Sequence, residues 1–147
     1  FDDDEPIAIG RGAWCPFNTQ NTLWQREAAL LMYLPAWCSF RMTDIWRSFV
    51  AQRLGWERGW HVLFTAPTVR QERNEHNLMR DFAEEIPGYL NNLRLCEALE
   101  RLPLSPNDRD MANNLRCCYQ MLVSMSLVDQ RELALVDAWQ EDISTVL

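Results

Sequence analysis

Several stretches of the sequence carry side chains that could bind a sugar, a phosphate or a metal ion. The first is a run of five amide and hydroxyl side chains between Trp14 and Trp24, Asn18-Thr19-Gln20-Asn21-Thr22. Because amides and hydroxyls both donate and accept hydrogen bonds, they suit sugar hydroxyls, and the flanking indole rings offer apolar faces. A capped loop that leads into the next helix accounts for the same residues equally well.

The sharpest single candidate is Asp44, which follows Thr43 at a predicted helix start. A carboxylate at that place can point into a cleft and act as a general base toward an acceptor hydroxyl. Periodicity alone favours a simpler interpretation, an ordinary helix cap that the helix dipole stabilises. Asp44 is therefore a candidate catalytic residue. Its neighbours in the structure distinguish a general base from a helix cap.

A polar loop after a predicted strand carries three candidates for a phosphate site, Arg70, Arg73 and His76. Loops at strand ends often carry binding groups, and the planar fork of an arginine matches phosphate oxygens. The imidazole of His76 could bind a metal or a phosphate. From residue types alone, a solvated charged loop is the favoured alternative.

Acidic and sulfur ligands suggest metal sites less strongly. Two carboxylates one residue apart, as in Asp2-Asp3-Asp4, can bind a divalent metal that bridges a nucleotide diphosphate, but acidic runs are also common at solvated chain ends. Five cysteines without a Cys-x-x-Cys pair, and two histidines, argue against structural zinc. The cysteines are expected to be buried thiols, and a Cys15–Cys38 bridge is the alternative in an oxidising compartment.

Composition limits the class of protein to which these residues belong. The 147 residues are enough for one domain, and the net charge of -7 argues against a protein that binds duplex nucleic acid. All 14 basic residues are arginine, so lysine nucleophiles and phosphate-loop lysines are excluded. Residues 6–80 hold 9 basic against 5 acidic side chains, so an anion site is expected there. The longest mostly apolar run, 28–40, is too short for a membrane span of about 20 residues.

The elements expected to position these side chains fall into two parts. Residues 1–80 are predicted to be a mixed α/β part, and residues 81–147 an all-helical tail of the same domain. The pattern predicts strands at 7–9 and 61–65, the second of them buried, and loops at 13–21 and 68–78. Helices are predicted over 22–34, 43–56 with one apolar stripe, 81–102, 105–125 and 129–147, the last two capped by Ser105 and Asp129.

Two runs resemble the signature of the STELLO-like glycosyltransferases. They are Trp-Cys-Pro-Phe-Asn-Thr-Gln-Asn-Thr-Leu-Trp at 14–24 and Thr-Asp-Ile-Trp-Arg-Ser-Phe-Val-Ala-Gln-Arg at 43–53. Trp56-Glu57, Pro67-Thr68 leading to Arg73, and the stretch 135–143 in the last predicted helix fit further blocks of that family in matching order. The similarity covers nearly the whole chain.

The resemblance implies a fold, a reaction and a setting. The fold would be the C-terminal part of a GT-A-like nucleotide-sugar transferase, with short strands and helices followed by a helical tail. The donor would be a nucleotide sugar, the acceptor is unknown, and a divalent metal, manganese, would have its ligands mostly outside this chain. The family also implies the Golgi, a membrane anchor upstream in the full-length protein, and protein partners in a polysaccharide-synthase complex. The nucleotide-binding half would lie elsewhere, so this segment is expected to be inactive alone.

The resemblance also assigns roles to residues. Asp44 is similar to the acid in the Asp-Ile segment of exostosin-type transferases, which faces the reaction centre. The residues implied to contact the sugar substrates are Trp14, Asn18, Gln20, Asn21 and Arg47, and those implied to contact the donor diphosphate are Arg70, Arg73 and His76. The family's metal-binding Asp-x-Asp lies further upstream than Asp2–Asp4, so no metal ligand is assigned here.

Two other functions fit the same sequence. The chain could be a non-catalytic scaffold that keeps the transferase fold and binds a polysaccharide-synthase complex. It could also be a helical interaction module in which the acidic tail, residues 81–147, makes the contacts.

Overall fold

The computed structural model describes residues 5–72 and 75–146, so Asp2–Asp4, Arg73 and Leu147 lie outside the described residues. Its elements, in which η marks a 3-10 helix, are β1 (Ile7–Ile9), η1 (Arg26–Met32), η2 (Phe40–Met42), α1 (Thr43–Glu57), β2 (Val62–Phe64), α2 (Leu78–Arg101), η3 (Asp108–Asp110), α3 (Met111–Ser124) and α4 (Glu132–Val146). The predicted mixture of short strands and helices, with helices following the polar loop, is confirmed.

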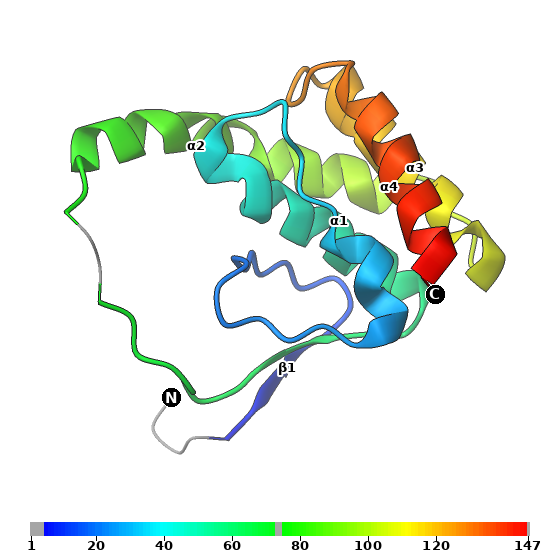
Figure 1. The fold of residues 1–147 in the computed structure, drawn as a ribbon, viewed down its shortest axis with the longest axis horizontal. Helices are drawn as coiled ribbons and strands as arrows, with labels where there is room; N and C mark the ends of the chain where they lie inside the picture. The colour runs from blue at the N-terminus through cyan, green and yellow to red at the C-terminus, as the bar shows by residue number, and fades with distance from the viewer. Residues whose placement is uncertain (1–4, 73–74, 147) are drawn as a thin grey trace.

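The two strands form a small antiparallel ribbon beside the helices (Figure 1). Ile7 pairs with Phe64 and Ile9 pairs with Val62. The strand predicted at 7–9 is confirmed, but the buried strand predicted at 61–65 is shorter and half-exposed. Leu63, its central residue, keeps 57% of its surface exposed, because a two-stranded ribbon covers its residues on fewer sides than a larger sheet would.

Helix α1 runs through the middle of the molecule and contacts α2, α3, η1 and η2 (Figure 1). Every residue from Trp46 to Trp56 is buried. The helix predicted there is confirmed, but its single apolar stripe is wrong, because α1 has neighbours on all sides. A helix in that position must satisfy its polar side chains within the protein.

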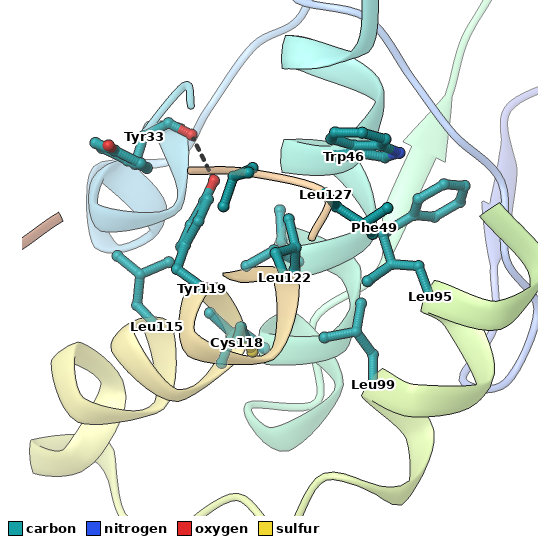
Figure 2. Close-up of a cluster of buried hydrophobic side chains, with 14 of the residues drawn as sticks. Tyr33, Trp46, Phe49, Leu95, Leu99, Leu115, Cys118, Tyr119, Leu122 and Leu127 are labelled. Carbon is teal, nitrogen blue, oxygen red and sulfur yellow. Dashed lines mark hydrogen bonds between the residues drawn. The ribbon is translucent and has the colours of Figure 1, made fainter. Parts of the chain in front are cut away.

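The core forms where α2 and α3 pack against α1 (Figure 2). Leu95 and Leu99 of α2 are fully buried there, as are Cys118 and Tyr119 of α3. The hydroxyl of Tyr119 donates to the backbone carbonyl of Tyr33 at 3.4 Å, which the dashed line in Figure 2 marks. This bond ties the segment after η1 to the centre of the core.

A second polar anchor joins the start of α4 to the turn after η1. The carboxylate of Glu132 is fully buried and accepts hydrogen bonds from the hydroxyl of Tyr33 and the backbone amides of Ala36 and Trp37. The Trp37 amide lies 2.7 Å from Oε2. Burial and this carboxylate together raise the pKa of the Tyr33 hydroxyl, which therefore stays protonated as a donor.

Three helix starts differ from the sequence-based prediction because side chains bond elsewhere. The hydroxyl of Thr22 donates to the carbonyl of Asn18 at 2.8 Å, which holds it in the preceding loop, and the expected 22–34 helix is the 3-10 helix Arg26–Met32. Ser105 bonds Asp110, so α3 begins only at Met111. The helix predicted from Asp129 begins only at Glu132. The Asp129 side chain accepts from the backbone amide of Arg131, and the Glu132 carboxylate bonds Tyr33 and the turn after η1.

All five cysteines are free thiols, and none of the described helices is both long and apolar enough to cross a membrane. Burial raises the pKa of Cys38, Cys96 and Cys118 to about 12. The thiol form of each is therefore favoured by folding. The resulting stability is fully present below the unfolded-state pKa of about 8.5 and is lost as pH rises toward 12.

These thiols should react slowly in the folded chain. At pH 8 we expect Cys38, Cys96 and Cys118 to remain unmodified by N-ethylmaleimide, because the thiolate is the reactive form and burial suppresses it. Denaturant should expose all five cysteines to the reagent. Peptide mass spectrometry after timed labelling measures this. Labelling of Cys118 at the unfolded rate would contradict the buried placement.

The Glu132 anchor should contribute strongly to stability. We expect Glu132→Ala to lower the free energy of unfolding by about 3 kcal/mol, because it leaves the Ala36 and Trp37 amides without their acceptor. Urea denaturation measures the change. Glu141→Ala, on an exposed side of the same helix, is the matched control and should change stability by less than about 0.5 kcal/mol. Equal effects of the two substitutions would refute the anchor.

Candidate functional site

The start of α1 and the loop before η1 meet in one polar cluster. Asp44 lies in the first turn of α1, half-buried, and its Oδ2 accepts a hydrogen bond from the backbone amide of Thr19 at 3.3 Å. Arg47 lies three residues further along the same face of the helix, and its Nη2 donates to the Thr19 hydroxyl at 3.3 Å. Thr19 therefore bridges the carboxylate and the guanidinium.

The guanidinium of Arg47 is buried among aromatic rings. Its Cζ lies 5.2 Å from the ring centroid of Phe17 and 4.8 Å from that of Trp24. Burial lowers the pKa of Arg47, whereas the nearby charge of Asp44 acts in the opposite direction. The aromatic faces offset part of the cost of removing this cation from water.

One hydrogen-bond donor of Arg47, its Nε, has no partner among the described residues. The residue is only 2% exposed, and this nitrogen is buried. Buried donors are rarely left unpaired in native proteins, so Arg47 carries a hydrogen-bonding demand that the described residues do not meet. The cluster thus offers a carboxylate acceptor and a guanidinium donor one helical turn apart.

The predicted amide residues surround Thr19 in the same loop. The Oδ1 of Asn18 accepts from the backbone amide of Gln20 at 3.0 Å, which closes a tight turn. Asn21 has a left-handed backbone, with φ of 51°, and its Oδ1 accepts from the hydroxyl of Thr68 at 3.0 Å. That bond connects this loop to the segment after β2, where Arg70 lies two residues further on and is exposed.

Trp14 lies apart from this cluster. Its indole nitrogen donates to Glu100 at 2.6 Å, and its ring centroid lies 4.4 Å from that of Trp56 and 5.7 Å from that of Phe49. Trp56 is twelve residues beyond Asp44, roughly 18 Å along the helix. Packing between α1 and α2 accounts for Trp14 in the structure, and its predicted contact with substrate has no support from the geometry.

His76 belongs to a different cluster, at the start of α2. Its Nδ1 lies 3.3 Å from Oδ2 of Asp81 and 3.4 Å from Nη2 of Arg41, and Arg41 in turn pairs with Asp81. The bond to Asp81 raises the pKa of Arg41. The third predicted phosphate ligand, Arg73, lies outside the described residues.

Two residues of the cluster, Phe17 and Thr68, were not predicted from the sequence. Phe17 supplies a ring over Arg47, and Thr68 holds Asn21. One signal was available for Phe17, because an arginine inside a buried helical run such as Trp46–Phe49 needs aromatic or polar cover from elsewhere. For Thr68 no local pattern gives the contact, since 47 residues separate it from Asn21.

The cluster holds a single acidic residue, Asp44. Within residues 5–72 and 75–146, no three His, Cys, Asp or Glu side chains come together as a metal site would require. The described residues therefore do not fit a metal centre of their own.

Comparison with known proteins places most of the chain in one group. The family model described as STELLO glycosyltransferases matches residues 41–147. Two proteins of Arabidopsis thaliana, named Probable glycosyltransferase STELLO2 and Probable glycosyltransferase STELLO1, are each 35% identical to the chain over 101 residues. The match covers 67% of this chain but 13% of each relative's length.

Substitution by methionine should affect stability much less at Arg47 than at Arg53, the other buried arginine of α1. Arg47→Met removes a buried cation with an unpaired Nε, so we expect stability to change by less than about 1 kcal/mol. Arg53→Met removes donors to the carbonyls of Leu99 and Leu102 and to Glu57, and should cost about 3 kcal/mol. Thermal and urea unfolding measure both. A loss at Arg47 as large as at Arg53 would show that Arg47 serves the fold rather than a ligand.

Proposed function

Because the chain belongs to the STELLO glycosyltransferase family, we propose that it forms the acceptor side of a GT-A-type domain that transfers a sugar from a nucleotide-sugar donor to an acceptor hydroxyl. The chain spans about 13% of the length of the curated relatives it matches. The reaction is therefore proposed for the longer protein, and the residues below are its contribution from this segment.

The observation that carries the proposal is the pairing of Asp44 with a buried Arg47 that keeps a donor unpaired. The Thr19 amide binds Oδ2 of Asp44 and so orients the carboxylate, which leaves Oδ1 as the oxygen to receive the proton of the acceptor hydroxyl. Asp44 acts as the general base or positions that hydroxyl. A structural helix cap would need neither the arginine nor its aromatic cover.

Arg47 holds the sugar in this scheme. Its Nε, which the fold closes off from solvent, donates to a sugar oxygen once the Phe17 and Trp24 rings that cover the guanidinium move aside. The amides of Asn18, Gln20 and Asn21 contact further sugar hydroxyls from the loop around Thr19.

The arginines that follow β2 in sequence are proposed to face the donor diphosphate. The Thr68–Asn21 bond brings this segment to the amide loop, and Arg70 follows it in sequence. Arg70, together with Arg73, would offset the negative charge that develops on the leaving diphosphate. His76 already lies between Arg41 and Asp81, so we assign it to positioning the start of α2 instead.

The remaining parts of the proposal concern the longer protein. A divalent metal, manganese by the family resemblance, is proposed to bind the donor through ligands mostly outside these residues. The Golgi, a membrane anchor and partners in a polysaccharide-synthase complex are proposed on the same ground.

The test is Asp44→Asn in the full-length protein. Asparagine keeps an oxygen for the Thr19 amide but cannot take a proton, so we expect kcat to fall about 100-fold or more while KM for the donor changes little. Asp137→Asn, at the half-buried ion pair with Arg116 between α3 and α4, is the matched control and should leave kcat unchanged. An unaltered kcat at saturating donor would exclude Asp44 from the reaction.

A further inference from the structure

From Leu78 to Leu93, about two thirds of its length, α2 presents a row of large apolar side chains to solvent. In Figure 1 the beginning of this helix extends past α1, away from α3 and α4. Seven residues keep between 40% and 76% of their surface exposed: Leu78, Met79, Phe82, Ile86, Tyr89, Leu90 and Leu93. At these fractions each presents on the order of 100 Å², so together they expose roughly 800 Å². Monomeric proteins rarely expose an apolar patch of that size.

The spacing of these residues is that of a coiled-coil seam. Met79, Phe82, Ile86, Tyr89 and Leu93 follow one another at intervals of three, four, three and four residues. That repeat of 3.5 residues is what a helix needs to face another helix along its length. The row therefore predicts a helical partner rather than a strand or a small molecule.

The opposite side of α2 is fixed to the body, so the row cannot turn inward. Gly88 packs so closely on η2 that a Cβ there would lie 2.5 Å from the Sδ of Met42. Asn92 accepts a hydrogen bond from the indole of Trp46 at 3.1 Å, and Leu95 is fully buried. The apolar face is thus held outward by the packing of the rest of the helix.

We propose that this face of α2 is a dimer interface, on which a second copy of the chain packs with its own α2 antiparallel. A two-fold axis near residues 87–88 would place Phe82 against Leu93 of the partner subunit and Ile86 against Tyr89 of the partner subunit. Each layer then joins two different apolar residues, and the axis generates the same layers again. Such self-complementarity is what a two-fold interface requires.

The flanks of the row fit this arrangement without repelling charges. On one flank Glu85 would face Asn92 of the partner subunit, and on the other Ala83 would face Leu90 of the partner subunit. The carboxylate of Glu85 already accepts from the Tyr89 hydroxyl at 3.0 Å. Leu78 and Met79 lie beyond this register, so the rest of the row offers roughly 600 Å² per chain. Two copies then bury about 1,200 Å² in total, the lower end of the range for a specific interface.

Sedimentation equilibrium of the 147-residue chain tests the dimer. We expect a dimer that Phe82→Lys or Leu93→Glu each weakens at least tenfold, because each places a charge in two of the seam layers. Circular dichroism should show both variants folded, since both side chains are exposed. Leu63→Glu, an equally drastic change on the exposed ribbon, is the control and should leave the dimer intact.

Mixing the two variants tests the antiparallel register. A mixed dimer pairs Lys with Glu in one layer and restores Phe82 against Leu93 in the other, so association should recover to within about tenfold of the parent chain. A parallel pair would not bring these positions together. A chain that stays monomeric, variants that dimerise like the parent, or a mixture that fails to recover would each overturn the proposal. A monomer would leave the face to another part of the longer protein or to a helix from a different protein.

Discussion

Helix α1 passes through the centre of the molecule with no side open to water, and four of its buried residues are polar. Each of the longer three reaches a different neighbour. Arg47 reaches the loop at Thr19, Gln52 accepts from the amide of Cys15, and Arg53 donates to the carbonyls at the end of α2. The cost of burying these groups is met only when all these neighbours are in place. The arrangement of the surrounding elements therefore depends on α1.

The candidate site is one product of that arrangement. The loop that satisfies Arg47 also delivers Thr19 to Asp44, so the groups proposed to handle substrate are held by the contacts that hold the fold. Arg53 differs from Arg47 in one respect. Its donors meet backbone carbonyls and Glu57, whereas Arg47 retains a buried nitrogen without a partner. Functional residues commonly keep such an unpaired hydrogen-bonding group, which lowers the stability of the fold.

Much of the fold could be predicted from local sequence, and the failures share one physical cause. The strand at 7–9 and the helices after the polar loop follow from periodicity and are confirmed. The single stripe on α1 and the starts of the helices near 22, 105 and 129 were wrong, because contacts from distant segments decided them. For the site, the sequence predicted that Asp44 lies at a helix start and that the amide residues lie in the preceding loop. Both residue sets lie in those elements, Asp44 in α1 and the amide residues before η1. It could not show that Trp14 and His76 pair elsewhere.

Most of the hydrogen bonds that anchor α1 and Glu132 join a side chain on one element to a backbone group on the other. Arg53 donates to the carbonyls of Leu99 and Leu102. Glu132 accepts from the amides of Ala36 and Trp37. Backbone groups are the same for nearly every amino acid. The residue that supplies the side chain is therefore constrained in evolution. A residue that supplies only its backbone group can change its side chain without losing the hydrogen bond. A homologue can thus change the side chains at Ala36, Trp37 and Leu102 and keep these anchors, whereas Leu95 and Leu99 remain constrained because they also fill the core.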